Sequence, residues 1–142
     1  MEDGPGNKSM KMTPQRMAIM KHLDGNTYHP SAADIYGALR EQFPTMSLAT
    51  VYNTLEVLKE QGTVIELSID RGKKRFDPNP KPHHHLMCIR CKAIVDVFVE
   101  FPLTLPDAQT QGFEVIGNRV DFYGICRSCS DEQKGSMQID QK

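Results

Sequence analysis

The sequence predicts an α+β fold, and three observations lead to that prediction. Within residues 13–62, three segments each begin with a Thr or Ser suited to capping a helix and continue with apolar residues at helical spacing. Residues 63–77 then alternate apolar and polar positions around a turn, which is typical of a β-hairpin. The four cysteines form two C-x-x-C pairs, and that spacing fits one tetrahedral zinc ion.

Length and composition set the outer limits. The chain has 142 residues, of which 39% are hydrophobic and 25% are charged, so we expect a globular protein of one ordinary domain or two small ones. Its net charge is -1 and neither half is basic, so binding to nucleic acid would depend on shape and local charge. The N-terminus has no apolar signal region and no run approaches membrane-spanning length, so a cytoplasmic protein is expected.

The first helix follows residues 1–10, which are expected to be a mobile tail. Thr13 is the predicted N-cap and Pro14 the first helical residue, where proline has no hydrogen-bonding N–H to lose. Gly25 and Asn26 are expected to end the helix. Its apolar side consists of Met17, Ile19, Met20 and Leu23.

Two further helices are predicted before residue 62. Ser31 and Asp34 form a capping signal of the S-x-x-[DE] type, and Pro44 breaks the helical pattern about a dozen residues later. Ser47 caps the third helix, which Gly62 closes. The apolar positions are Ile35, Ala38, Leu39 and Phe43 in the second helix, and Leu48, Val51, Leu55 and Leu58 in the third.

Strands at 63–69 and 73–77, joined by a turn at 70–72, complete this half of the chain. Three helices followed by such a hairpin make a winged helix-turn-helix, which we place at residues 11–79. The hairpin concentrates cations where a wing would approach phosphates, although a solvated turn explains such a run equally well. These cations are Arg71, Lys73, Lys74 and Arg75.

The exposed face of the third helix is the predicted reader of DNA bases. Its N-terminal part carries Ala49, Thr50, Tyr52 and Asn53 off the apolar stripe, where a recognition helix meets base edges. Asn can pair with adenine, Thr can meet a phosphate or a base, and Tyr can pack on a thymine methyl. Ordinary helix packing is the alternative explanation for Tyr52.

Residues 76–91, with the sequence FDPNPKPHHHLMCIRC, combine two kinds of metal ligand. On a strand, His83 and His85 would face one side and His84 the other, which gives a nitrogen and oxygen site beside a sulfur site. Redox motifs or disulfides are the alternatives for the cysteines, but two matched pairs favour structural zinc, with a βαβ-like segment between them. The predicted zinc ligands are Cys88, Cys91, Cys126 and Cys129.

Six motifs follow one another in an order that resembles a known family. They are Thr13-Pro14-Gln15-Arg16, His29-Pro30-Ser31-Ala32-Ala33-Asp34-Ile35-Tyr36, Ser47-Leu48-Ala49-Thr50-Val51-Tyr52-Asn53, Arg75-Phe76-Asp77, His83-x-His85-x-x-Cys88-x-x-Cys91 and Tyr123-Gly124-x-Cys126-x-x-Cys129. From about residue 11 to residue 130 they are similar to the ferric uptake regulator (Fur) family. The resemblance implies a metal-dependent, homodimeric transcription repressor rather than an enzyme. It also implies a hinge at 80–82 and a dimerisation domain at 83–130, and we expect a disordered tail at 131–142.

The resemblance also implies a regulatory metal site and a palindromic operator. A metal held by residues of both domains would fix them in one relative orientation and favour the DNA-competent form. The implied ligands are His29, Asp77, His83, His85 and Asp96. The expected DNA contacts are Lys11, Arg16, Ala49, Thr50, Tyr52, Asn53, Arg71, Lys73 and Lys74.

Within the family, the chain looks like the peroxide-sensing PerR branch. Both regulatory carboxylates are Asp, and an additional metal site of many Fur proteins looks incomplete, because Pro82, Leu103 and Asn118 stand where His or Glu is common. By resemblance, Fe(II) would cleave peroxide and a ligand histidine, His29 or His83, would be oxidised, which releases the metal and the DNA. Mn(II) in the same site would give a peroxide-insensitive repressor.

Other functions remain open at this point. An iron-, manganese- or zinc-responsive repressor without peroxide sensing is the nearest alternative, and a thiol-based redox switch is more remote. A metallo-hydrolase would also hold histidines and carboxylates around a metal, but the sequence has no H-E-x-x-H motif. No small-molecule substrate other than peroxide is expected.

One segment departs from the family pattern. An amphipathic helix is usual at residues 98–111, but here Pro102 and Pro106 interrupt the stretch, so at most about two helical turns are expected. Strands at 113–116 and 120–125 are predicted to carry the dimer sheet. We therefore expect an altered dimer surface.

Overall fold

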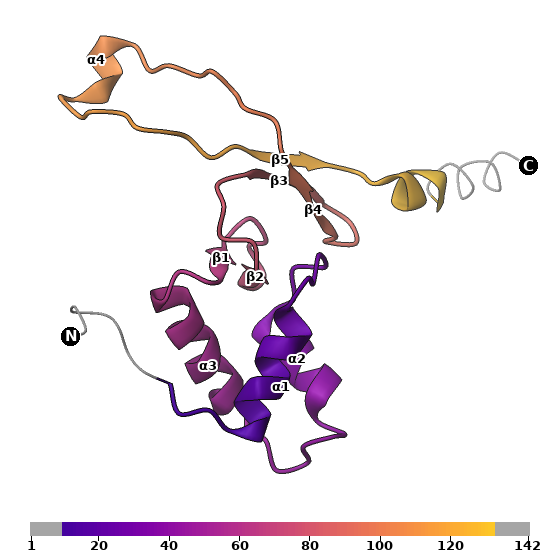
Figure 1. Ribbon diagram of the computed structural model, residues 1–142. Coiled ribbons are helices and arrows are strands. Elements are labelled where there is room, and N and C mark those ends of the chain that lie inside the picture. Colours follow the sequence, from indigo (N-terminus) through magenta and orange to yellow (C-terminus); the bar gives the residue numbers. More distant parts are fainter. Residues whose placement is uncertain (1–9, 133–142) are drawn as a thin grey trace, which may run out of the picture. The chain divides into compact units, whose positions relative to one another are not determined.

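The structure of the protein is a computed structural model that describes residues 10–132 (Figure 1). It divides into two compact units between Lys81 and Pro82, and each unit has its own secondary structure. The predicted tails, 1–10 and 131–142, lie outside the described residues except at their inner ends. There the prediction is wrong, because Met10 packs against the apolar core and residues 127–132 form a helix.

Three helices build most of the N-terminal unit, and each begins where the sequence predicts. They are α1 (Pro14–Leu23), α2 (Ala32–Leu39) and α3 (Leu48–Glu60). The hydroxyls of Thr13, Ser31 and Ser47 accept backbone N–H groups at 3.2, 3.1 and 3.1 Å. At α2 the carboxylate of Asp34 also accepts the N–H of Ser31 at 2.9 Å, which completes a capping box.

The second helix ends earlier than its apolar pattern predicts. It stops at Leu39, while Phe43 lies in the following turn and still packs against the core with a half-buried side chain. The residue before a proline disfavours helical conformation, so Pro44 keeps Phe43 out of the helix. Gly62, with φ of 76°, closes α3 as predicted.

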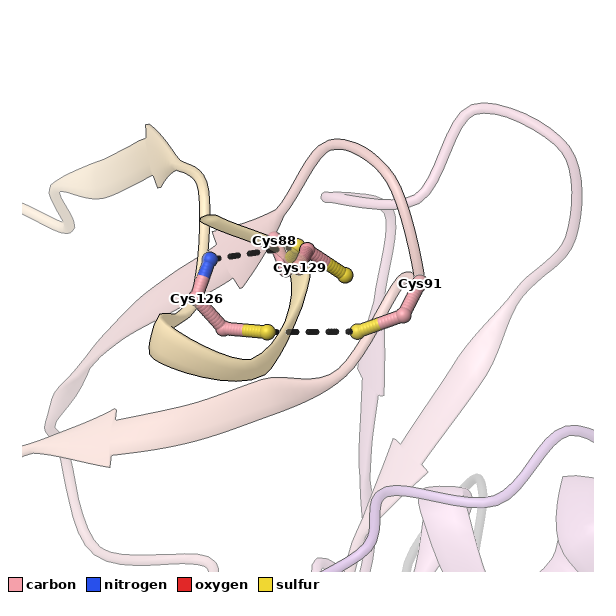
Figure 2. Close-up of side chains that lie close together, drawn as sticks. All are labelled: Cys88, Cys91, Cys126 and Cys129. Carbon is pink, nitrogen blue, oxygen red and sulfur yellow. Dashed lines mark hydrogen bonds between the residues drawn. The ribbon is translucent and has the colours of Figure 1, made fainter. Parts of the chain in front are cut away.

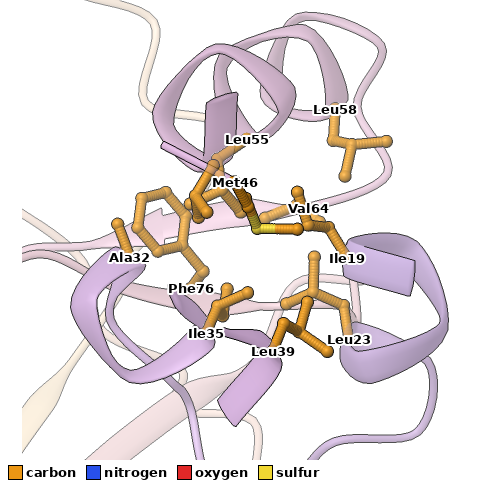
Figure 3. Close-up of a cluster of buried hydrophobic side chains, with 11 residues drawn as sticks. Ile19, Leu23, Ala32, Ile35, Leu39, Met46, Leu55, Leu58, Val64 and Phe76 are labelled. Carbon is orange, nitrogen blue, oxygen red and sulfur yellow. The ribbon is translucent and has the colours of Figure 1, made fainter. Parts of the chain in front are cut away.

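The apolar core of this unit lies between the three helices and the hairpin (Figure 3). Ile19 and Leu23 face it because they are one helical step of four residues apart, whereas Met17 lies off that face and is 58% exposed. Leu48 was also predicted to belong to the core, but it is the first residue of α3 and is 39% exposed. The core residues are Ile19, Leu23, Ala32, Ile35, Leu39, Met46, Val51, Leu55, Leu58, Val64 and Phe76.

A short antiparallel ribbon completes the N-terminal unit. Strands β1 (Ile65–Leu67) and β2 (Arg75–Asp77) pair with Glu66 opposite Phe76, so both are shorter than predicted. The loop at 68–74 is shaped by Asp70, whose Oδ1 accepts the N–H of Gly72 at 2.9 Å. This local side-chain bond competes with the ladder and shortens the strands.

The C-terminal unit contains a three-stranded sheet in the order β4-β3-β5 (Figure 1). Strand β3 (His84–Cys88) pairs antiparallel with β4 (Ile94–Val97) and parallel with β5 (Asp121–Gly124). Between β4 and β5 the chain makes a long excursion that contains the four-residue helix α4 (Asp107–Thr110). The segment between the cysteine pairs therefore has the predicted order of strand, short helix and strand, but β4 and β5 run in opposite directions on either side of β3.

The predicted strand at 113–116 is not formed. Residues 113–120 are irregular, and Phe113 and Ile116 are 78% and 96% exposed. A strand exists through its ladder to a neighbour, and no strand of the described chain pairs with this segment.

No helix within residues 10–132 is long and apolar enough to cross a membrane.

The capping box at α2 gives a stability prediction. Replacing Ser31 by Ala removes the acceptor for the N–H of Asp34, so we expect the free energy of unfolding to fall by about 1 kcal/mol. Urea unfolding followed by circular dichroism measures this loss. Ser68→Ala, at an exposed serine of the hairpin loop, is the matched control and should change the free energy little.

The same contact should appear in the titration of Asp34. Partial burial by itself would raise the pKa of this carboxyl, but hydrogen bonds from the backbone and side chain of Ser31, together with the charges of Lys73 and Arg75, hold the pKa below the ordinary 3.8. The ionised form is therefore favoured by folding, and its contribution to stability is lost as the pH falls through the lowered pKa. Ser31→Ala keeps the backbone N–H that the carboxylate accepts and removes only the hydroxyl, so carbon-detected NMR should show a small rise in the Asp34 pKa. An unchanged pKa would show that the hydroxyl does not contribute to the lowering.

Candidate functional site

The four cysteines lie together in the C-terminal unit (Figure 2). Their sulfur atoms are all within 4.8 Å of one another, and Cys91 and Cys126 are 3.7 Å apart. Tetrahedral zinc with Zn–S bonds of about 2.3 Å places its sulfur ligands about 3.8 Å apart. None of the four forms a disulfide. The donor set and spacing therefore fit a zinc ion with no open coordination position.

Two of these thiols differ sharply in acidity. The backbone N–H of Cys126 donates to the sulfur of Cys88 at 3.4 Å, and this bond is the main reason that the pKa of Cys88 is lowered to about 6. A hydrogen bond with the side chain of Cys126, followed by burial, raises the pKa of Cys129 to about 12. Ligand cysteines must be thiolates, so zinc binding releases the Cys129 proton and weakens in acid.

A second cluster, without sulfur, is formed by His83, which directly precedes β3, together with residues of β3 and β4. The Nε2 atoms of His83 and His85 lie 2.9 and 3.3 Å from the same oxygen of Asp96, and both imidazoles are buried. In the sheet register His85 stands directly opposite Asp96. His84 points to the other face, where its Nδ1 accepts the N–H of Val120 at 2.9 Å, so the predicted alternation is confirmed. Two histidines and one carboxylate are a donor set that suits Fe(II) and related divalent metals.

The N-terminal unit contains a histidine and carboxylate pair of its own. His29 lies between α1 and α2, and its Nε2 is 3.2 Å from Oδ2 of Asp77, the last residue of β2. Both side chains are buried. We call this pair the His29–Asp77 half-site, because two ligands are fewer than a divalent metal takes from a protein site.

Arg75 is buried, although the sequence predicts it to be one of the hairpin cations that approach phosphates. The guanidinium is buried, with Nη1 3.3 Å from Oδ2 of Asp70, so Arg75 is not one of the exposed hairpin cations. Its Nε donates to the carbonyl of His29 and its Nη2 to that of Tyr28 at 3.1 Å. Sequence analysis missed this role, although alternation on a strand places Arg75 and Asp77 on one face.

The predicted DNA contacts all lie in the N-terminal unit. On α3, Ala49, Tyr52 and Asn53 are exposed, whereas Thr50 is half-buried and its hydroxyl is 3.0 Å from that of Ser47. Arg16 is half-buried and donates to the carbonyl of exposed Lys11 at 2.7 Å.

The hairpin cations on this list are exposed. Two of them carry exposed or partly exposed ion pairs, Lys73 with Asp34 at 3.6 Å and Lys74 with Glu66 at 3.4 Å. Such exposed pairs contribute little to the stability of the fold.

Sequence and structure comparisons identify the family. The profile of the Ferric uptake regulator family matches residues 7–123, and the chain belongs to that family. The peroxide operon regulator of Bacillus subtilis (strain 168) is 41% identical over 128 residues, which are 87% of each chain. The structure superposes on the peroxide stress regulator of Campylobacter jejuni with a TM-score of 0.60 at 31% identity, covering 82% of this chain and 89% of that one. It superposes on the ferric uptake regulator of Francisella tularensis, solved with iron, with a TM-score of 0.67 at 24% identity, covering 92% and 98%.

The two clusters should respond differently to substitution. Cys91→Ala leaves three sulfur ligands, so we expect loss of zinc and a fall of roughly 6–12 °C in the melting temperature, which corresponds to about 3 kcal/mol. Asp96→Ala should leave the zinc content at that of the unaltered chain. Metal analysis and thermal melting measure both effects. If Asp96→Ala lost zinc and melted as early as Cys91→Ala, the separation of the two clusters would be wrong.

Proposed function

We propose that this chain is a metal-dependent, DNA-binding transcriptional repressor that senses peroxide. The observation that carries the proposal is the sulfur-free cluster, in which two buried imidazoles converge on one carboxylate oxygen of Asp96. Family membership and relatives named for peroxide response at about 40% identity support it. We assign the zinc site made of cysteines to folding and the sulfur-free cluster to regulation.

The regulatory metal would be held by ligands from both units. The half-site in the N-terminal unit offers two ligands and the cluster in the C-terminal unit offers three, so neither fills a five- or six-coordinate ion. An ion that takes all five, His29, Asp77, His83, His85 and Asp96, fixes residues 11–79 relative to residues 83–130 across a hinge at 80–82. Such a ligand shifts an equilibrium between conformations, and couplings of this kind are typically ~1–3 kcal/mol.

Peroxide sensing is assigned to this set of ligands. Fe(II) bound with one open position would supply the chemistry that cleaves the O–O bond of peroxide. The imidazole of His29 or His83 takes up one oxygen atom and the other leaves as water, so histidine is oxidised by two electrons and peroxide is reduced. The altered ring is a poorer ligand, and the two units are no longer held together. Because the chain consumes its own ligand, it is a single-use sensor rather than an enzyme.

DNA recognition is assigned to the N-terminal unit and dimerisation to the C-terminal unit. The exposed face of α3 would enter the major groove while the hairpin cations approach phosphates, as in a winged helix-turn-helix. A homodimer with two such units reads a palindrome whose half-sites follow the two-fold symmetry of the protein.

The peroxide mechanism has a direct test. Zinc-containing protein is loaded with Fe(II) without oxygen, bound to an operator selected from random-sequence DNA, and treated with a modest excess of peroxide. We expect DNA release together with a gain of one oxygen atom on the peptide that carries His29 or His83. Mass spectrometry of the peptides and fluorescence anisotropy of the DNA follow the two events.

Mn(II)-loaded protein is the matched control, and it should keep both the DNA and unmodified histidines. Retained DNA and unmodified histidines in the iron form would instead indicate an iron- or manganese-responsive repressor. DNA release with oxidised cysteines, reversed by reductant alone, would indicate a thiol switch.

The role of α3 in DNA binding is tested by Tyr52→Ala. Tyr52 is 52% exposed, so its loss should not disturb the core, but we expect operator affinity to fall about tenfold to hundredfold, the usual cost of a lost base contact. Tyr28→Ala, at a tyrosine that is 83% exposed outside α3, is the control and should keep full affinity. Equal affinities of the two variants would remove Tyr52 from the interface.

A further inference from the structure

Arg75 is a buried cation that neither the proposed DNA contacts nor the metal ligands use. Its hydrogen-bond partners include the carbonyls of Tyr28 and His29 and the carboxylate of Asp70. A buried guanidinium requires such partners, since desolvation of an unpaired charge is costly. All of these groups belong to the N-terminal unit.

Strand β2 holds His29 at both its main chain and its side chain. Arg75 and Asp77 are two residues apart on this strand and share one face, while Phe76 between them packs in the core. Arg75 binds the main chain at His29, and Asp77 lies 3.2 Å from its imidazole. The N–H of Phe76 donates to the carbonyl of Pro30 at 2.9 Å, which fixes the next residue of the segment.

His29 adopts a backbone conformation that requires outside support. Its φ is 54°, in the left-handed region that residues other than glycine seldom occupy unless their surroundings impose it. The carbonyls of Tyr28 and His29 belong to the two peptide groups on either side of the His29 α-carbon. Because one guanidinium binds both carbonyls, it fixes the two peptide planes that set this conformation.

We propose that Arg75 is a positioning residue that holds His29 in the orientation in which it and Asp77 bind the regulatory metal. The proposal rests on the regulatory site of the proposed function. Arginine suits this task because its planar fork reaches several acceptors at once, which the single ammonium of lysine does not. Asp70 extends the network to the hairpin loop, because its second oxygen accepts the N–H of Gly72.

The test is Arg75→Lys, which keeps the charge and removes the fork. Mn(II) is titrated into protein that contains zinc at the cysteine site, and free Mn(II) is followed by electron paramagnetic resonance. We expect Mn(II) to bind tenfold to hundredfold more weakly, the usual effect of losing a residue that orients a ligand. Arg40→Lys, at an exposed arginine that follows the last residue of α2 and belongs to neither proposed site, is the matched control and should bind Mn(II) like the unaltered chain.

A double-mutant cycle separates positioning from general stability. If Arg75 acts through His29, Arg75→Lys in the His29→Ala background should weaken Mn(II) binding no further. Equal weakening in both backgrounds, or none in either, would overturn the positioning role. The proposed function fails separately, if His29→Ala itself leaves Mn(II) affinity unchanged.

A measurement on the unaltered chain covers the case in which Arg75→Lys does not fold, as judged by zinc content and thermal melting. The Nε–H of Arg75 donates to the His29 carbonyl, so in nitrogen-15 NMR it should exchange with water far more slowly than that of Arg71. Equal exchange rates of the two groups would overturn the proposal.

Discussion

Both ligand clusters of the C-terminal unit depend on the hydrogen-bond ladder that joins β3 to its two neighbours. The antiparallel register with β4 places His85 opposite Asp96, and the parallel register with β5 places Cys88 opposite Gly124, two residues before Cys126. A slip of one residue would turn the histidines of β3 to the opposite face. The sheet is therefore the scaffold that gives each cluster its composition.

Within one strand and its neighbours, the fold separates two coordination chemistries. Four thiolates around zinc leave no position for water or peroxide, so this cluster is suited to holding structure. Imidazole and carboxylate donors suit harder divalent ions, and a site made of them can leave coordination positions open for exchange and reaction. His84 lies between His83 and His85 but belongs to neither cluster, because the pleat turns it toward Val120. Sequence proximity alone does not decide ligand identity here.

The N-terminal unit combines an apolar core with a buried polar network beside it. Arg75 and Asp70 form an ion pair, and His29 and Asp77 form a second pair, with all four residues buried. In a low-dielectric interior such groups are costly unless each has a partner, so the network has few alternative arrangements. The consequence is that the candidate metal ligand His29 lies in a connecting segment but is bound to strand β2 at both its main chain and its side chain.

Local sequence signals by themselves determined the helix starts, the cysteine pairs and the alternation of the histidines. Thr13, Ser31 and Ser47 cap their helices through contacts three residues away, and a strand alternates whatever its neighbours are, so these features need no knowledge of the fold. For the same reason, the spacing within the two cysteine pairs predicted one shared ion site, and this prediction did not require the structure of the segment that connects the pairs.

Only the tertiary structure decided what depends on distant partners. In the sequence, Arg75 is one of four hairpin cations. In the structure it is buried, because carbonyls of the segment at 28–30, more than forty residues earlier, accept hydrogen bonds from its guanidinium. Residues 113–116 have a strand composition but no strand to pair with in the described chain, and they remain irregular. Burial and pairing are properties of the surroundings, whereas capping, spacing and alternation are properties of the local chain.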